Sequence, residues 1–362
     1  MACTIYLSEV FHAFIHMDEG REKGMIDGRL SKARQFTLGA DPEMFLFSGN
    51  TLIPAYEFLP PKGEKISLYW DGFQAEWKYT DVTIFCQNNL VMYTRQALMR
   101  LQARAVAYDA FARLSLANVV RIPQATLDTV DPRYVELGCQ PSYNAYWLKG
   151  EPVYDPRKLP YRFAGGHMHF GTWNTPGRAV EYIRPNYERI VKTLDSILGI
   201  WAVGAARALD NPIRRRYYGL AGEYRKPKYA DGLGVEYRVL SNWWLAAPST
   251  LQVTWDIGRM CVRLASSLKY SKMWAGNEDE TVDVINNCDV PRANAIIKRN
   301  EGMFRWLLGQ VYWKQDSVTR ALQLTYQGLE SIVPEPEAIA ANWHFEEAWI
   351  KDAGAAWARW EK

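Results

Sequence analysis

Five pairs of polar residues stand two positions apart in the sequence, each in a segment whose polar and apolar residues alternate. The pairs are Asp41 and Glu43, Gln74 and Glu76, His167 and His169, Glu223 and Arg225, and Glu236 and Arg238. Because side chains alternate between the two faces of a strand, both members of a pair would lie on one face. If the strands are neighbours, that face gathers carboxylates, imidazoles and guanidinium groups. Such a set suits divalent ions of the magnesium or manganese type and the phosphates that they bridge.

A simpler explanation exists for any single pair, because a one-sided antiparallel sheet shows a polar residue at every second position. Solvated faces usually carry Thr, Lys, Ser and Gln, so pairs drawn almost wholly from Asp, Glu, His and Arg favour a site. The His-Met-His triplet would also suit zinc, but no third His or Cys lies near it in the sequence. Oxygen ligands dominate the set and favour the harder cations.

Other catalytic motifs are absent or incomplete. The sequence has no GxxxxGK[ST] loop and no GxSxG elbow, and DGLGVEY at 231–237 lacks the third glycine of a dinucleotide loop. Cys139 has no neighbouring histidine that would activate it as a nucleophile. The basic cluster Arg214, Arg215 and Arg216 fits either a solvated turn or an anion-binding site.

The elements that must position these pairs follow from periodicity and from Gly and Pro. Strands are predicted at 36–47, 65–79, 163–173, 214–228 and 233–245, with a hairpin turn at Asp71-Gly72. Helices are predicted at 83–116, 178–208, 249–269 and from 274 to the end, interrupted by a linker at 333–340. Strands followed by long helices, without regular alternation, predict an α+β fold with a largely antiparallel sheet.

Composition narrows the class of protein. The chain has 362 residues, of which 48% are apolar and 23% charged, so it can bury a core. A net charge of +3 argues against a surface dedicated to nucleic acid. No stretch of about 18 apolar residues appears, which argues against a membrane span. The first 20 residues lack a signal-peptide pattern and the five cysteines form no CxxC pair, so a cytoplasmic protein is expected.

The strings that carry the pairs resemble, in this order, the carboxylate-amine ligases of the glutamine synthetase and glutamate-cysteine ligase superfamily. The closest resemblance is to the type 2 ligases of tailed phages and bacteria. The strings are GADPEMFLF at 39–47, DGFQAEW at 71–77, GGHMHFG at 165–171, RRRYYGLAGEYR at 214–225 and GVEYRVLSN at 234–242. LGCQPSYNAYW at 137–147 also resembles a type 2 segment, with Gln140 where an acid is common.

The resemblance implies that ATP phosphorylates a carboxylate and that an amine then displaces phosphate, which leaves an amide and ADP. It implies Mg²⁺ or Mn²⁺ ligation by Glu43 and Glu76 nearer the substrate, with Asp71 as a further candidate. Asp41, His167 and Glu236 would hold the ion that bridges the β- and γ-phosphates. The remaining site residues would act on the phosphates: His169, and Arg238 helped by Arg225 or by Arg214, Arg215 and Arg216.

The resemblance also implies a division of the chain: residues 1–275 as a glutamine synthetase-like domain with long helices on one face of its sheet, and 276–362 as a helical extension. Trp343, Trp349, Trp357 and Trp360 fit either packing on that domain or a contact in a homo-oligomer. The substrates would be a small-molecule or peptide carboxylate and an amine. Two alternatives stay open: a phosphotransferase of the guanidino kinase type, and a catalytically silent ATP-binding, metal-binding or virion-associated protein.

Overall fold

The computed structural model describes residues 36–63, 67–78, 87–136, 142–146, 155–172, 187–229, 232–265, 277–311 and 315–345. These residues form a mixed α/β structure in which every strand pairing is antiparallel. The expected combination of antiparallel sheet and helices is confirmed. The more specific glutamine synthetase-like architecture stays a prediction.

The first sheet has the order β1-β10-β13-β11-β8, with β12 also paired to β13. Its strands are β1 (Phe36–Ala40), β8 (Tyr143–Asn144), β10 (Met168–Thr172), β11 (Glu223–Arg225), β12 (Lys228–Tyr229) and β13 (Gly232–Tyr237). The register sets Gly39 opposite His169, His169 opposite Glu236, and Glu236 opposite Arg225. Three polar residues of the predicted pairs therefore form one row across the sheet.

The second sheet has the order β3-β2-β5-β4, with β6 paired to β2. Its strands are β2 (Glu43–Ser48), β3 (Thr51–Ile53), β4 (Leu68–Asp71), β5 (Gln74–Trp77) and β6 (Ala112–Ser115). Glu43 faces Glu76, and Glu76 faces Tyr69. The predicted hairpin is confirmed: Asp71 pairs with Gln74 around Gly72, whose φ of 63° a glycine adopts without strain.

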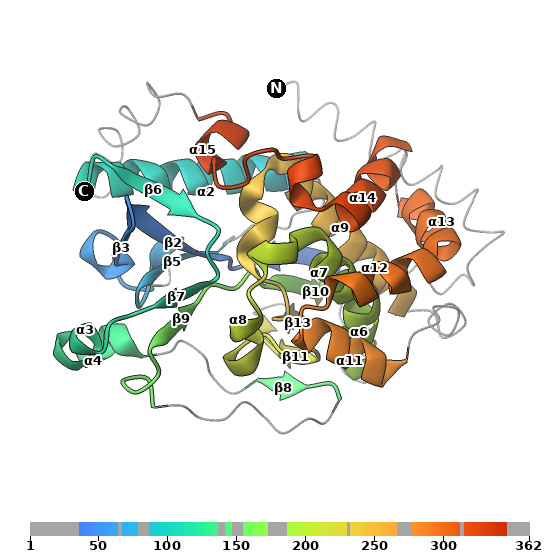
Figure 1. Cartoon of the computed structure of the whole chain (residues 1–362), viewed down its shortest axis with the longest axis horizontal. Helices are drawn as coiled ribbons and strands as arrows, with labels where there is room; N and C mark the ends of the chain where they lie inside the picture. The colour runs from blue at the N-terminus through green and yellow to red at the C-terminus, as the bar shows by residue number, and fades with distance from the viewer. Residues whose placement is uncertain are drawn as a thin grey trace.

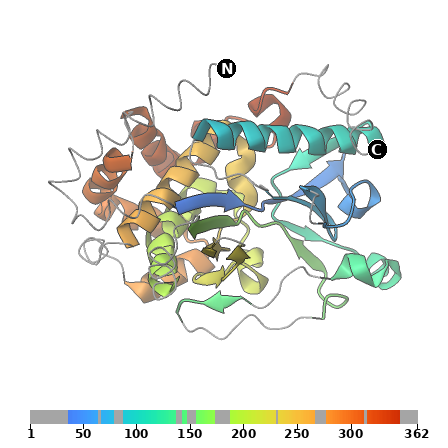
Figure 2. The ribbon, with the colours of Figure 1, turned by 180° about the vertical axis from the view of Figure 1, so that it is seen from behind.

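The predicted strand at 36–47 is wrong in one respect, because it is two strands in two different sheets. The break falls at Pro42, which has no N–H to continue a ladder. The next amide, that of Glu43, donates to the carbonyl of Gly165 at 2.9 Å. Asp41 therefore lies where the chain passes from one sheet to the other, and Figure 2 shows β1 in the middle of the molecule at this passage.

The predicted strand at 163–173 is divided in a similar way. β9 (Tyr161–Phe163) pairs with β7 (Val119–Arg121) in a separate two-stranded sheet, whereas β10 begins at Met168. Gly165 and Gly166 lie between them, and a Cβ on Gly166 would come within 2.3 Å of the Ser241 carbonyl oxygen. Gly166 is thus required by close packing of the backbone at the junction of the sheets.

The long helices are confirmed with shorter bounds. α2 (Gln87–Tyr108) ends before β6, which the sequence analysis had included in the helix. The predicted helix at 178–208 is described from 187 onward, as α6 (Tyr187–Leu194), a π-helical turn over Asp195–Gly199, and α7 (Ile200–Ala206). α9 (Pro248–Ala265) agrees with the prediction at 249–269 within the described residues. Figure 1 shows α2 lying along the second sheet, where it packs on β6, and it also contacts α9.

One predicted extended segment begins as a helix. Residues 214–228 were expected to be a strand, but α8 spans Pro212–Tyr217 and only β11 and β12 follow it. The Asn211 side chain accepts from the amide of Ile213, and Pro212 occupies the first turn. A capping side chain followed by proline is a helix start signal that outweighs the alternation after it.

Within the described residues 277–311 and 315–345, the C-terminal part is helical as predicted, whereas Trp349, Trp357 and Trp360 lie outside the described residues. Its helices are α11 (Glu278–Asn286), α12 (Val290–Arg299), α13 (Glu301–Val311), α14 (Gln315–Gln327) and α15 (Ile339–Asn342), and two short helices elsewhere are α3 (Gln124–Thr129) and α4 (Pro132–Val135). α12 and α14 pack on α7, and α13 packs on α9. Trp343 is fully buried and its indole donates to the Leu245 carbonyl at 2.7 Å, so this tryptophan packs in the core.

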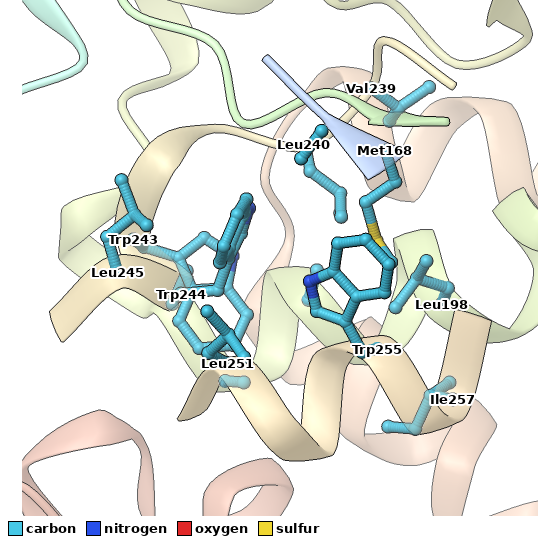
Figure 3. Packing of buried hydrophobic residues seen from close by; sticks show 14 of the residues in the cluster. Met168, Leu198, Val239, Leu240, Trp243, Trp244, Leu245, Leu251, Trp255 and Ile257 are labelled. Carbon is cyan, nitrogen blue, oxygen red and sulfur yellow. The ribbon is translucent and has the colours of Figure 1, made fainter. Parts of the chain in front are cut away.

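A tryptophan-rich core supports the first sheet from behind. Trp243, Trp244 and Trp255 are buried, and Figure 3 shows Trp255 beside Met168 and Leu198. A Cβ on Gly258 would lie 3.0 Å from the Met168 methyl carbon, so α9 approaches β10 closely. The cluster around these tryptophans also includes residues of α12 and α14, so it continues beyond position 275. Two smaller buried clusters lie apart from it, one around Phe45 and Phe73 and one around Phe163 and Tyr218.

The described part of the chain contains two cysteines. Cys261 and Cys288 are free thiols, and Cys3, Cys86 and Cys139 lie outside the described residues. Among the helices that the structure describes, none has both the length and the apolar character needed to cross a bilayer.

Candidate active site

Six side chains from the predicted pairs and the hairpin turn form two groups at the junction of the two sheets. Glu43, Asp71 and Glu76, here named the carboxylate cluster, each offer an oxygen within 4.8 Å of the others. Asp41, His167 and Glu236, here named the histidine cluster, meet the same limit. The structure therefore brings together all five predicted metal ligands and Asp71, the further candidate.

The carboxylate cluster lies on one face of the second sheet. Glu43 and Glu76 face each other across β2 and β5, and Asp71 ends β4. The Tyr69 hydroxyl donates to Glu76 Oε1 at 2.5 Å, and Lys62 Nζ lies 3.3 Å from the same oxygen. Lys62 comes from the loop before β4, and its side chain is 62% exposed, so it stands at the solvent side of the cluster.

The histidine cluster is built from two connections between elements and one strand. Asp41 comes from the β1–β2 passage, His167 immediately precedes β10, and Glu236 lies in β13. His167 Nδ1 is 3.4 Å from Asp41 Oδ1 and 3.8 Å from Glu236 Oε1. His169 Nε2 lies 2.9 Å from the same Asp41 oxygen. One imidazole nitrogen and two carboxylates thus converge on one point.

Gly165 joins the two clusters. Its amide donates to Glu43 Oε2 at 2.7 Å, and a Cβ at this position would lie 2.3 Å from His167 Nε2. The glycine therefore lets the His167 ring lie against the backbone that holds Glu43. This explains in physical terms why a glycine precedes the histidine in the sequence.

The acids of the carboxylate cluster resist ionisation in the absence of a cation. Burial, followed by the charges of Asp71 and Glu76, raises the pKa of Glu43 well above its usual value. Burial, followed by the charges of Asp41 and Asp71, raises the pKa of Glu76 to about 8. Burial also raises the pKa of Asp71. A bound cation would relieve this repulsion and allow all three carboxylates to ionise.

In the histidine cluster the carboxylate of Asp41 is instead held in its ionised form. Burial opposes ionisation of Asp41, but the charge of His169 and hydrogen bonds with both imidazoles hold its pKa well below the usual value. Burial lowers the pKa of His167, although Asp41 partly opposes this. His167 is therefore neutral at pH 7, the form in which an imidazole binds a metal. Burial acts against the charge of His169, yet Asp41 raises its pKa.

Two arginines border Glu236. Arg225 Nη1 lies 3.5 Å and Arg238 Nε 3.6 Å from Glu236 Oε1. The Arg225 side chain is 24% exposed, whereas that of Arg238 is 1% exposed. Arg238 Nη2 donates to the Tyr218 hydroxyl at 3.0 Å, and the same hydroxyl shares a hydrogen bond with His167 Nε2. Tyr218 therefore couples the arginine to the histidine.

Arg214 and Arg215, which were predicted to bind the nucleotide, instead bind groups of the protein itself. The Arg214 guanidinium donates to the carbonyls of Arg238, Val239 and Leu240, and Arg215 donates to two carbonyls and to Asp210. Both side chains are buried, so they hold the end of β13 and the turn after α8. The expected phosphate contact does not fit these two residues, because their N–H groups already serve the backbone. Arg216 is exposed.

Three contributors escaped the sequence analysis. Tyr69 was detectable, because the hairpin register alone sets it opposite Glu76. Lys62 and Tyr218 lie in loops or at a helix end and reach their partners over 14 and 51 positions, so no local pattern signals them.

Residues 145–280 match one family model, described as phage phiEco32-like COOH.NH2 ligase-type 2. The matched segment includes His167, Glu236 and Arg238, whereas the entire carboxylate cluster and Asp41 precede it. Membership in the glutamine synthetase superfamily, expected from the sequence, stays a prediction.

Curated proteins and solved structures provide less information about this chain than the family model does. No curated protein matches the chain. Among solved structures, a bifunctional glutathione synthetase from Pasteurella multocida is similar, with a TM-score of 0.49 and 9% identity over 88% of this chain and 52% of that one. The chain thus spans about half the length of that structure.

Proposed function

We propose that the protein is an ATP-dependent carboxylate-amine ligase that forms an amide through an acyl phosphate and releases ADP and phosphate. The observation that carries the proposal is the juxtaposition of two acidic clusters with Arg225 and Arg238 at one junction of two sheets. The family match over residues 145–280 supports the same reaction class. The substrates would be a small-molecule or peptide carboxylate and an amine, used in the cytoplasm.

The donor atoms fit Mg²⁺ or Mn²⁺. Both clusters offer carboxylate oxygens, one adds an imidazole nitrogen, and neither offers a thiolate. Bound there, the cations would neutralise charge on the transferred phosphoryl group and orient the acceptor carboxylate. Neutral His167 would use Nδ1, which faces Asp41 and Glu236, so Nε2 carries the proton and donates to Tyr218.

The arginines differ in how they would serve phosphate. Buried Arg238 is fixed by Tyr218 and Glu236, so its guanidinium would meet the transferred phosphoryl group without rearranging. Arg225 is partly exposed and would contact the nucleotide from the solvent side, near His169. Loss of one such preorganised contact typically raises the barrier by about 3 to 4 kcal/mol.

We also propose the division into a catalytic domain at 1–275 and a helical extension at 276–362 that completes its core. The contacts of α12 and α14 with α7 favour a structural role for this extension, in which it packs against the helices of the catalytic domain. A homo-oligomer is a further proposal, which size-exclusion chromatography with light scattering would test.

The experiment that tests the ligase is ADP release from ATP and Mg²⁺ with pools of amino acids and polyamines. The full chain is compared with Glu236→Gln, and exposed Glu335→Gln is the control with the same chemical change. Release that requires both a carboxylate and an amine, is lost in Glu236→Gln and persists in the control is expected. Release with one acceptor and a stable phosphorylated product would instead indicate a phosphotransferase. Failure to bind ATP in calorimetry would favour a silent protein.

A further inference from the structure

Gln74 belongs to a predicted pair, yet the proposed reaction gives it no role. It is 8% exposed, and its side-chain oxygen is buried without a hydrogen-bond donor among the described residues. A buried amide oxygen without a partner costs free energy, so such atoms are uncommon in folded proteins. The oxygen therefore calls for a partner that the protein chain itself does not supply.

The direction of this side chain follows from the strand register. Gln74 and Glu76 are two positions apart in β5, so they lie on the same face. Gln74 also pairs directly with Asp71 of β4, and residues opposite each other in an antiparallel pair share a face. Gln74 thus lies on the face of the carboxylate cluster, opposite Asp71 across the hairpin and two positions from Glu76 along β5.

We propose that Gln74 supplies an uncharged fourth oxygen to the cation that Glu43, Asp71 and Glu76 bind, an inference that rests on the proposed function. Amide carbonyl oxygens are ordinary ligands of hard divalent cations. A neutral ligand adds coordination without a fourth buried negative charge, so the loaded cluster keeps a net charge of about −1. Substrate oxygens and water complete the coordination.

The test uses Mn²⁺ alone, titrated into the full chain and followed by electron paramagnetic resonance of free Mn²⁺ and by calorimetry. Glu76→Gln and Glu236→Gln identify which class of Mn²⁺ sites belongs to which cluster. Gln74→Leu is expected to weaken the carboxylate-cluster class at least about tenfold and to leave the other class unchanged. Gln74→Glu is expected to tighten the same class, because it adds a charged ligand.

A second readout separates ligation from a structural role. Without metal, Gln74→Leu is expected to keep or raise the melting temperature, because it removes an unsatisfied buried carbonyl. The rise in melting temperature on adding Mn²⁺ should shrink. The control is Gln102→Leu, another buried glutamine, whose amide donates to the Ala112 carbonyl at 2.7 Å. This control should lose stability and keep its Mn²⁺ affinity.

Three outcomes decide the matter. Unchanged Mn²⁺ affinity in Gln74→Leu, or a lower melting temperature without metal, would overturn the role of Gln74 while leaving the ligase proposal intact. Metal effects as expected in a chain without ligase activity would leave the role of Gln74 standing and remove the ligase. A wild-type chain that binds no Mn²⁺ would overturn the metal site and the role of Gln74 together.

Discussion

The two clusters hold their protons in opposite ways, although they lie side by side. Asp41 is ionised because two imidazoles face it, and its charge in turn raises the pKa of Glu76. Glu43 and Glu76 retain protons because burial and neighbouring acids disfavour further negative charge. The carboxylate cluster must therefore lose protons when it binds a cation, whereas His167 and Asp41 are already in their binding forms.

Proton release gives a prediction for the pH dependence of metal binding. Because protons compete with the cation for Glu76, whose pKa is about 8, Mn²⁺ affinity at the carboxylate cluster should rise between pH 6 and pH 8 and then level off. Calorimetry in buffers of different ionisation enthalpy measures the protons released. Glu76→Gln should release fewer protons on binding. Proton release equal to that of the wild type in this variant would contradict the prediction.

At this scale the sequence pattern identified residues that the structure brings together, because each belongs to a short segment with a period of two. Their role as metal ligands stays a prediction. The pattern could not predict how they divide between sites. The proposed grouping of Asp41 with His167 and Glu236 came from the family resemblance, and the distances agree with it. The sequence could not assign Arg214 and Arg215, because a run of arginines is the same whether the guanidinium groups bind phosphate or backbone carbonyls.

The elements build the site at breaks in strands. Alternation predicts single strands at 36–47 and 163–173, but both segments pass from one sheet to another. Periodicity detects an extended backbone and carries no information about which sheet a strand joins. Pro42 and the Gly165–Gly166 pair mark the passages, and Asp41 and His167 stand next to them. These breaks place two strand faces at one junction.

A substitution at the second passage tests its importance. Gly165→Ala would set a Cβ 2.3 Å from His167 Nε2, so the ring must shift from its place beside Asp41 and Glu236. Such overpacking costs about 1–3 kcal/mol of stability, and the displaced ring should weaken Mn²⁺ binding at the histidine cluster at least about tenfold. Thermal unfolding and Mn²⁺ titration measure both effects.

Gly302→Ala serves as the control, because a Cβ there meets nothing within 4 Å. It lies in α13 and should stabilise the chain slightly, by up to about 1 kcal/mol, since alanine favours helix more than glycine. Unchanged metal binding in Gly165→Ala would mean that the close approach to His167 does not position the ring.

At the scale of the whole molecule, a buried hydrogen bond joins the first sheet to the helices packed behind it. Tyr237 is the last residue of β13 and stands between Glu236 and Arg238 in the sequence, so its side chain points away from the clusters towards the helices. Its hydroxyl donates at 2.6 Å to Asp195 Oδ1, in the π-helical turn between α6 and α7. The helical layer thus fixes the strand that carries two site residues. The sequence could not predict this contact, because the apolar spacing in 178–208 indicates one regular helix and gives no sign of the π-helical turn that contains Asp195.

Asp195 makes this contact sensitive to pH. Burial raises its pKa from 3.8 to about 7, although hydrogen bonds from Tyr237, Gly222 and Tyr146 oppose the change. The folded chain therefore keeps a proton that the unfolded chain loses between about pH 4 and pH 7. The contribution of this group to stability must fall as pH rises through that interval and be constant above it.

Asp195→Asn should therefore gain stability relative to the wild type as pH rises from 5 to 8. The relative change should reach a few kcal/mol, since each tenfold change in proton binding is worth about 1.4 kcal/mol. Melting temperatures of both chains without metal, from pH 5 to pH 8.5, measure it. The exposed Asp128→Asn variant should instead follow the wild-type curve. If the Asp195→Asn and wild-type curves run parallel, the buried carboxyl ionises normally and the helical layer holds β13 by packing alone.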